Sequence, residues 1–115
     1  MKENSSAVLE GLMNYPFHYT LRKTFSNENM YSIWTMTINI NYYLPDFNAT
    51  LSFLDEHDND WFLKQNSNTQ SFHGALFLSL FMQGIPTLYY GTERQMRETR
   101  GTFWTEKSTE TAKLV

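Results

Sequence analysis

Two stretches of the sequence decide the fold: FLDEHDNDWF at positions 53–62 and GIPTLYYGTE at positions 84–93. In the first stretch, a short apolar run ends in a group of acidic residues around one histidine. An apolar segment at 75–82 follows, and the second stretch then opens on a run of β-type residues. Acidic residues and a histidine at the carboxyl end of a buried strand are typical of β/α-barrel enzymes. The two stretches therefore predict an α/β fold with a functional site in residues 55–60.

Around these stretches, the apolar pattern predicts strands that alternate with helices. Three short apolar runs indicate strands, at 12–15, 50–54 and 85–90. Three helices are expected: over 16–25, from a cap at Ser26 or Asn27 to about Asn41, and from a cap at Asn68 or Thr69 to about Gln83. Alternation of this kind favours parallel strands joined by helical crossovers.

Each predicted helix has an apolar face that should be buried. Phe17, Leu21 and Phe25 place one apolar stripe along the first helix. In the second helix the apolar positions follow a helical period: Met30, Ile33, Trp34, Thr37 and Ile38. The third helix is apolar nearly all round over 75–82, so it is expected to be deeply covered.

Length, charge and composition narrow the possible functions. At 115 residues the chain fits one domain, but it is less than half of a β/α barrel of about 250 residues. The net charge is −3 and no run of Lys or Arg occurs, so no nucleic-acid partner is expected. The longest apolar run is too short to span a bilayer, so no membrane partner is expected. The absence of cysteine excludes disulfides and thiolate chemistry.

The sequence leaves the cellular compartment open. Residues 1–10 are polar and lack the apolar core of a signal peptide. Two glycosylation sequons, at Asn4 and Asn48, permit a secretory route.

The residues that could carry chemistry lie within six positions: Asp55, Glu56, His57, Asp58 and Asp60. Their carboxylates could stabilise a developing positive charge, such as an oxocarbenium ion, while the histidine bonds a substrate hydroxyl. Alternatively, their oxygens could bind a hard cation. A solvated acidic loop without a specific role is the third possibility.

Familiar metal-site patterns do not match this group. An EF-hand starting at Asp58 would need a glycine at its turn and a glutamate at its twelfth position, and neither is present. A zinc site would need a second histidine at ligand spacing, and His18 and His73 lie far away in the sequence. Both of these histidines are expected to be packing or surface residues.

Three motifs resemble those of α-amylase-type enzymes, glycoside hydrolase family 13. Residues 53–59 resemble the fourth conserved region of the family, Phe-x-Asp/Glu-Asn-His-Asp, at the end of barrel strand seven. Residues 84–93 are similar to the eighth-strand motif Gly-Ile-Pro-x-x-Tyr-Tyr-Gly-x-Glu, and residues 12–19 to the sixth-strand segment Leu-Asn-Tyr-Pro-x-Tyr-Tyr. The motifs occur in the family order and at the family spacing.

The resemblance implies a partial (β/α)8 TIM barrel, with about three parallel strands and crossover helices from its C-terminal part, strands six to eight. Residues 10–94 are expected to form this barrel segment. Residues 1–9 are expected to be disordered or frayed, and residues 95–115 to be irregular.

The resemblance also implies roles for two residues. Asp58 matches the third catalytic carboxylate of the family, which stabilises the transition state, and His57 matches a histidine that hydrogen-bonds sugar hydroxyls. The family nucleophile and acid/base follow strands four and five, upstream of anything present here. The family calcium site also lies outside this chain, so no cofactor is expected in it. The implied reaction is retaining hydrolysis of α-glucosidic bonds in starch or malto-oligosaccharides.

Two departures from the family pattern affect these roles. Glu56 replaces the usual Asn, and two neighbouring carboxylates are expected to raise at least one of their pKa values. Arg94 stands where the family has Gln, so no substrate-binding role is carried over to Arg97 or Arg100. A catalytically inactive amylase-fold scaffold and an independent sugar-binding protein remain as alternatives.

Overall fold

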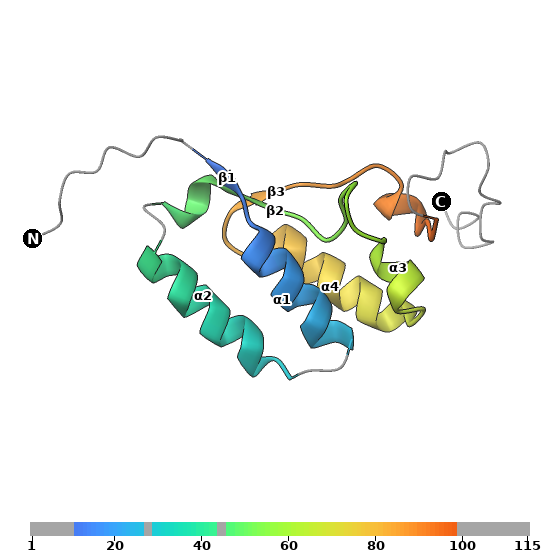
Figure 1. Cartoon of the computed structure of the whole chain (residues 1–115), viewed down its shortest axis with the longest axis horizontal. Helices are drawn as coiled ribbons and strands as arrows, with labels where there is room; N and C mark the ends of the chain where they lie inside the picture. Colours follow the sequence, from blue (N-terminus) through green and yellow to red (C-terminus); the bar gives the residue numbers. More distant parts are fainter. Residues whose placement is uncertain (1–10, 27–28, 44–45, 99–115) are drawn as a thin grey trace, which may run out of the picture.

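The computed structural model describes residues 11–26, 29–43 and 46–98, and its strands form a single parallel sheet. The strands lie in this spatial order: β1 (Leu12–Met13), β2 (Thr50–Ser52) and β3 (Ile85–Pro86) (Figure 1). Leu12 lies beside Thr50, and Leu51 lies beside Ile85. The three predicted parallel strands are confirmed, although each is shorter than expected.

The helices of the described residues are α1 (Tyr15–Ser26), α2 (Tyr31–Tyr43), η1 (Phe47–Ala49), α3 (Phe62–Gln65), α4 (Thr69–Phe81) and η2 (Thr92–Arg94), where η marks a 3-10 helix. α1 begins directly after β1 because the side chain of Asn14 accepts the Phe17 N–H at 3.1 Å. Pro16 occupies its first turn, where no N–H is needed. As predicted, Asn68 caps α4, accepting two backbone N–H groups of its first turn.

Two helices differ from the prediction: α2, which precedes the acidic group, and α3, which follows it. Ser26 is the last residue of α1 and not the cap of α2, and Asn27 lies outside the described residues. The side chain of Asn29 instead accepts the N–H of Tyr31, the first residue of α2, at 3.1 Å. α3 has no counterpart in the prediction, because four residues are too few to show a helical period.

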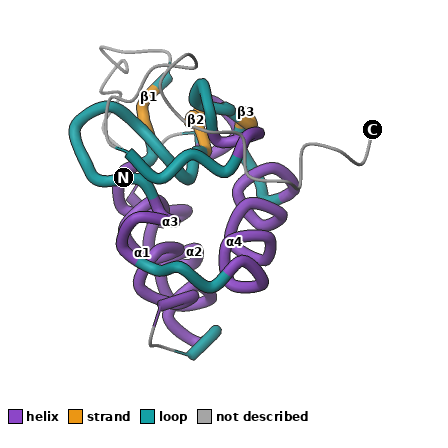
Figure 2. Tube along the Cα trace, turned by 90° about the vertical axis from the view of Figure 1, so that its right-hand side faces the viewer, coloured by secondary structure: helices purple, strands orange, loops and turns teal. Residues whose placement is uncertain are grey.

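Every labelled helix lies on the same side of the sheet (Figures 1 and 2). α1 packs against α2 on one flank and against α4 on the other. The core that they enclose contains Phe17, Leu21, Ile33, Leu54, Phe62, Leu63, Phe72 and Ala75. Phe17 and Leu21 confirm the predicted stripe of α1, and Phe25 is partly buried beside them.

The strand residues are much less covered than the helix interfaces. Leu12 and Met13 on β1 are each 43% exposed, and Ile85 on β3 is 49% exposed. Figure 1 shows no labelled helix on the side of the sheet opposite to α1, α2, α3 and α4. Strands of parallel sheets are normally covered on both faces, so this sheet has an apolar face without a partner in the described residues.

The buried face of α2 differs from the prediction. Of the predicted stripe only Ile33 is buried, and the buried face continues through Ile40. Met30, Trp34 and Ile38 are exposed. α2 is therefore apolar on two sides, and the pattern alone does not tell which side meets the core.

α4 is also covered on one side only. Phe72, Ala75 and Ser79 are buried, whereas Phe77 and Phe81 are exposed. The prediction that residues 75–82 are deeply covered is wrong for this outer face, because only one face of α4 meets α1 and α3.

Gly84 explains how α4 connects to β3. Its φ of +120° is a backbone conformation that other residues rarely adopt. A Cβ atom here would lie 2.7 Å from Ser52 Oγ and 2.8 Å from the Thr50 carbonyl oxygen. The glycine therefore lets the chain pass close to β2 as it enters β3.

Some predictions concern segments that the structure does not describe. The expected frayed segment at 1–9 lies outside the described residues, as does most of the irregular segment at 95–115. Residues 95–98 follow η2 without forming a helix or strand. None of the described helices combines the length and the apolar character needed to cross a membrane.

Candidate active site

The predicted site residues follow the middle strand of the sheet. After β2, Phe53 and Leu54 are buried, and the chain then turns through residues 55–60, called here the acid loop. Within it Asp55 and Glu56 are each only 3% exposed, whereas the side chains of His57 and Asp58 are 60% and 59% exposed. The loop is therefore not simply a solvated acidic turn, because half of its charges point inward.

Asp55 is the centre of a buried hydrogen-bond network. Its Oδ1 accepts the backbone N–H of Phe62, the first residue of α3, at 2.7 Å and lies 3.2 Å from Arg22 Nη1. Its Oδ2 accepts the hydroxyl of Thr92 at 3.2 Å. One carboxylate thus connects α1, the start of α3 and η2.

Arg22 contacts both arms of the acid loop. Its Nη1 donates to the carbonyl oxygen of Leu54 at 3.3 Å, on the incoming arm, and its Nη2 donates to the carbonyl oxygen of Asp60, on the outgoing arm. Burial raises the pKa of Asp55 and lowers the pKa of Arg22, and their mutual attraction opposes both shifts. Removing either partner would leave an uncompensated buried charge.

The Glu56 carboxylate accepts hydrogen bonds from other residues of the acid loop. One carboxylate oxygen accepts the backbone N–H of Asp58 at 2.6 Å, and the other accepts the side-chain amide of Asn59. Burial raises the pKa of Glu56, but these hydrogen bonds and the nearby His18 lower it by more, so the net shift is downward. The rise expected for at least one of the two neighbouring carboxylates is therefore not seen at Glu56.

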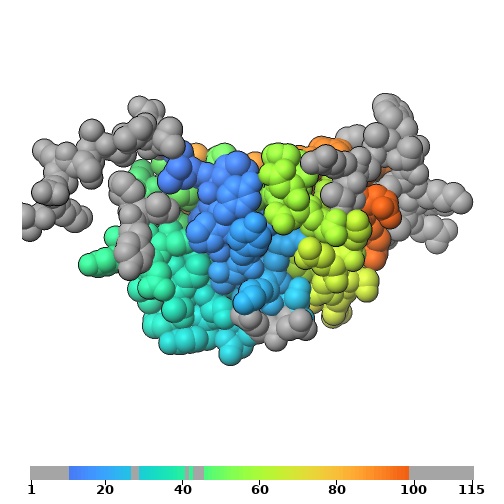
Figure 3. Space-filling view, in the orientation of Figure 1, coloured from blue at the N-terminus to red at the C-terminus, as the bar shows by residue number. Residues whose placement is uncertain are grey.

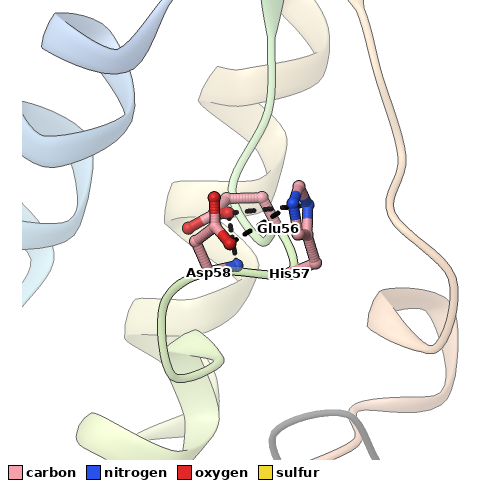
Figure 4. A group of neighbouring side chains, drawn as sticks. All are labelled: Glu56, His57 and Asp58. Atoms are coloured by element: carbon pink, nitrogen blue, oxygen red, sulfur yellow. Dashed lines mark hydrogen bonds and ion pairs between the residues drawn. The ribbon is translucent and has the colours of Figure 1, made fainter.

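His57 lies beside two carboxylates, which face the same side of its ring in Figure 4. Its Nδ1 is 3.9 Å from Glu56 Oε2, and its Nε2 is 3.3 Å from Asp58 Oδ1. Each of the three side chains could offer one ligand atom to a cation, and these atoms lie within 4.8 Å of one another. Both Glu56 oxygens already accept hydrogen bonds from the loop, so a cation would compete with Asp58 and Asn59 for them.

Aromatic residues of α1 border the acid loop. Tyr15 packs edge-on against Phe53 with ring centroids 5.4 Å apart. Burial, followed by the charges of Glu56 and Asp58, raises the pKa of Tyr15. The hydroxyl of Tyr19 accepts a hydrogen bond from the Asn59 side chain at 3.4 Å.

His18 is a packing residue, as predicted. It is fully buried and stacks on Phe53 with ring centroids 4.9 Å apart. Neither of its ring nitrogens has a hydrogen-bond partner in the described residues. Burial, followed by the charge of Arg22, lowers the pKa of His18 from 6.5 to about 4, so the ring is neutral at pH 7.

Residues 84–93, the second of the two stretches that decide the fold, contact Trp61 just after the acid loop. Trp61 is buried, and the rings of Tyr89 and Tyr90 meet it edge-on with centroids 6.0 and 5.7 Å away. Gly91 has a φ of +83°, and a Cβ atom there would lie 2.3 Å from the Trp61 ring. Only glycine can therefore approach this closely and bring Thr92 to Asp55.

Among the described residues, two of the hollows lie near these elements, and Asp58 is in the lining of neither. The larger, about 790 Å³, lies at the open edge of β1 between α1 and α2, with Met13, Met36 and Ile40 in its wall. The smaller, about 620 Å³, borders the acid loop and is lined by Tyr19, Arg22, Lys23, Ser26, Asn59 and Gln65. Figure 3 shows the loop, in light green, on the surface beside α1, in blue. The side chain of Asp58 is thus open to solvent and not enclosed by the described residues.

Sequence reasoning named His57 and Asp58 as candidates but missed the residues that hold their loop. Arg22 and Thr92 lie 33 and 37 positions away from Asp55 in the sequence. A basic residue next to the apolar stripe of α1 was the one available signal for Arg22. Thr92 had no signal apart from its place after the Tyr-Tyr-Gly segment.

Known proteins similar to this chain are α-amylases and related enzymes. The chain is 34% identical over 87 residues to an α-amylase from Niallia circulans, covering 74% of this chain and 16% of that protein. It is 30% identical over 87 residues to a cyclomaltodextrin glucanotransferase from Bacillus sp. (strain 38-2), covering 74% of this chain and 12% of that protein. No family model matches the chain.

The fold agrees with these sequence relatives. An α-amylase from Malbranchea cinnamomea superposes with a TM-score of 0.74 at 23% identity, covering 77% of this chain and 19% of that chain. This chain belongs to glycoside hydrolase family 13, the α-amylase family. It corresponds to the C-terminal part of the catalytic barrel, and β1, β2 and β3 are strands six, seven and eight.

The family explains the open side of the sheet. The chain spans between 12% and 16% of the length of the curated relatives it matches. In a closed (β/α)8 barrel, the inner faces of the strands meet in a packed core. The exposed strand residues of this α-amylase-family segment lie on the side where such a core forms. The acid loop lies at the carboxyl end of strand seven, the end at which barrel enzymes carry their active sites.

Proposed function

We propose that this chain forms part of the active site of an α-glucan hydrolase, with Asp58 as the transition-state stabiliser and His57 as a ligand of sugar hydroxyls. The observation that carries the proposal is the split of the acid loop at the carboxyl end of β2. Asp55 and Glu56 are buried and hydrogen-bonded, whereas Asp58 presents its carboxylate to solvent next to the His57 imidazole.

Burial and pairing single out Asp58 among the acidic residues of the loop. The carboxylate of Asp55 is used by Arg22 and Thr92, and that of Glu56 is used by the loop itself. Asp60 is paired with Lys64 at 3.0 Å. Asp58 is the most exposed carboxylate of the group, at 59% against 42% for Asp60, and its partner is the His57 imidazole.

Asp58 would stabilise the positive charge that develops on the sugar and would not form a covalent bond to it. In the proposed retaining reaction, a nucleophile forms a covalent glycosyl-enzyme while an acid/base protonates the leaving oxygen. The transition state has oxocarbenium character, so a fixed carboxylate near the sugar ring stabilises it more than the ground state. By the family pattern, the nucleophile and the acid/base follow strands four and five and are not part of this chain.

His57 would orient the sugar. Its ring is exposed and lies 3.9 Å from the Glu56 carboxylate and 3.3 Å from the Asp58 carboxylate. A held imidazole N–H can donate to a sugar hydroxyl without losing freedom on binding. The rings of Tyr15 and Tyr19 lie on the α1 side of the same loop and offer flat faces to a neutral sugar.

The proposed substrate is a neutral α-glucan or malto-oligosaccharide. No cofactor is proposed for these residues, and no nucleic-acid or membrane partner. An amylase-fold scaffold without activity is the alternative, and no observation of this structure favours it.

The test is a segment exchange. The matched segment of the Niallia circulans α-amylase is replaced by residues 10–94 of this chain, so that the host provides the rest of the barrel. The hybrid is expected to release reducing sugar from soluble starch, and Asp58→Asn is expected to lower kcat by at least about 1000-fold. Asp60→Asn, the same charge change two positions away, is the matched control and should leave kcat nearly unchanged.

The isolated chain is assayed in parallel. It is expected to show no turnover above that of its His57→Ala, Asp58→Ala variant, because the other members of the catalytic group are missing. A hybrid that melts cooperatively but does not cleave starch would support the scaffold alternative. Equal activity of the hybrid and its Asp58→Asn variant would refute the role given to Asp58.

A further inference from the structure

We propose that Asp55 is a positioning residue that sets the place of Asp58 and His57 by fastening three consecutive β/α units at their carboxyl ends. The inference rests on the function proposed above for Asp58 and His57. It concerns the group formed by Asp55, Arg22 and Thr92, called here the clasp.

The clasp closes the acid loop at its base. Asp55 Oδ1 accepts the N–H of Phe62, seven residues on, so the two ends of the loop are joined by one hydrogen bond of 2.7 Å. Arg22 reinforces this closure because it donates to the carbonyl oxygens of Leu54 and Asp60, one on each arm. His57 and Asp58 lie between these attachment points.

The clasp also relates the loop to its neighbours in the barrel. Arg22 lies on α1, which follows β1, and Thr92 lies on η2, which follows β3. Both reach the same carboxylate, at 3.2 Å each. A carboxylate that accepts from three elements fixes their relative positions, since displacement of any one element lengthens a charge-assisted hydrogen bond.

Because the clasp is buried, it is sensitive to the loss of a single hydrogen-bond donor. The side chains of Arg22 and Asp55 are 9% and 2% exposed, and Thr92 is buried as a whole. Water cannot easily replace a lost partner there, so removing one donor leaves the carboxylate under-satisfied. The effect should reach Asp58, three residues away, although Thr92 itself does not contact the exposed part of the loop.

Thr92→Val is the sharpest test, because it keeps the shape of the side chain and removes only the hydroxyl donor. Amide hydrogen exchange of the full chain is followed by mass spectrometry, comparing residues 55–60 with residues 72–78 of α4. The variant is expected to speed exchange in the acid loop by about tenfold and to leave α4 unchanged. Thr92→Ser, which keeps the hydroxyl, should restore slow exchange.

The chain offers a matched control in Thr24. This threonine is also buried, on α1, but its hydroxyl has no hydrogen-bond partner in the described residues. Thr24→Val should therefore leave exchange in the acid loop unchanged. Equal effects of Thr92→Val and Thr24→Val, or a rise in exchange that spreads evenly over α4, would overturn the proposal.

A kinetic measurement in the hybrid enzyme separates positioning from general stability. Thr92→Val is expected to lower kcat about tenfold with little change in KM, because Asp58 acts on charge that develops in the transition state. Thr24→Val should change neither constant. A Thr92→Val hybrid with unaltered kcat, in a background where Asp58→Asn abolishes activity, would refute the inference. If Asp58→Asn itself has no effect, the proposed function fails, and the exchange data still decide whether the clasp holds the loop.

Discussion

At the scale of single residues, the site depends on how the charges of four buried ionisable groups are compensated. Asp55 is paired with Arg22, and Glu56 accepts hydrogen bonds from its own loop. His18 instead stays neutral, because burial and the charge of Arg22 outweigh the opposing effects of Glu56 and of the Phe53 and Leu54 backbone. A buried group without a partner avoids the cost of burying a charge by shifting its pKa.

His18 predicts how stability depends on pH. Its pKa is about 4 in the folded chain and 6.5 as the ordinary value, so between these pH values the unfolded chain binds more protons. Stability contributed by His18 is therefore complete above pH 6.5 and is lost as the pH falls toward 4, by roughly 3 kcal/mol at most. The groups that face the ring are Arg22, Glu56, Tyr15, Tyr19 and Phe53.

His18→Phe isolates this contribution, because phenylalanine keeps the stack on Phe53 and cannot be protonated. Urea unfolding is measured between pH 4 and pH 7 for both proteins. The variant is expected to lose less stability than the parent as the pH falls. Parallel pH profiles for the two proteins would contradict the prediction.

At the scale of elements, some connections between the helices and the sheet contain a position where only glycine fits. Gly84 is the clearest, because the chain must pass close to Thr50 and Ser52 between α4 and β3. A positive φ and close backbone contact both act against any side chain there.

Gly84→Ala is therefore expected to destabilise the chain by about 2 kcal/mol or more. Gly74→Ala is the comparison, since the atoms nearest to a Cβ at Gly74 belong to the Phe25 side chain and not to the backbone, and alanine favours a helix. The two variants are compared by their urea midpoints. An equal fall of the urea midpoint in both variants would show that the close approach of Gly84 to β2 does not limit stability.

The element scale also shows where pattern reasoning reaches its limit. The stripe Phe17, Leu21 and Phe25 has one apolar side, so its burial could be predicted. α2 and α4 are apolar on more than one side, and neighbouring elements decide which side is covered. Trp34 and Phe77 are exposed for that reason, although their helices were placed correctly.

At the scale of the whole molecule, the described chain has more exposed apolar surface than a closed domain. The strand residues Leu12, Met13 and Ile85 are nearly half exposed, and aromatic side chains of α2 and α4 are also open. β1 and β3 each have one side without a strand neighbour in the described sheet. Open edges and apolar patches of this kind favour association with other chains.

The isolated chain is therefore expected to self-associate at micromolar concentrations. Size-exclusion chromatography with light scattering should show species larger than a monomer, and their share should grow with protein concentration. A monomer at all concentrations, with a single cooperative melt, would contradict the prediction.

The sequence by itself determined the order of the three strands and of α1, α2 and α4, the cap at Asn68, and the α-amylase family, because periodicity, capping and motifs are local properties. Only the tertiary structure decided that Asp55 and Glu56 turn inward while His57 and Asp58 stay at the surface. The physical reason is that the partners of Asp55 are Arg22 and Thr92, more than 30 positions away on either side. Five neighbouring polar residues look alike in sequence, and folding separates them by bringing a cation and a hydroxyl to one of their carboxylates.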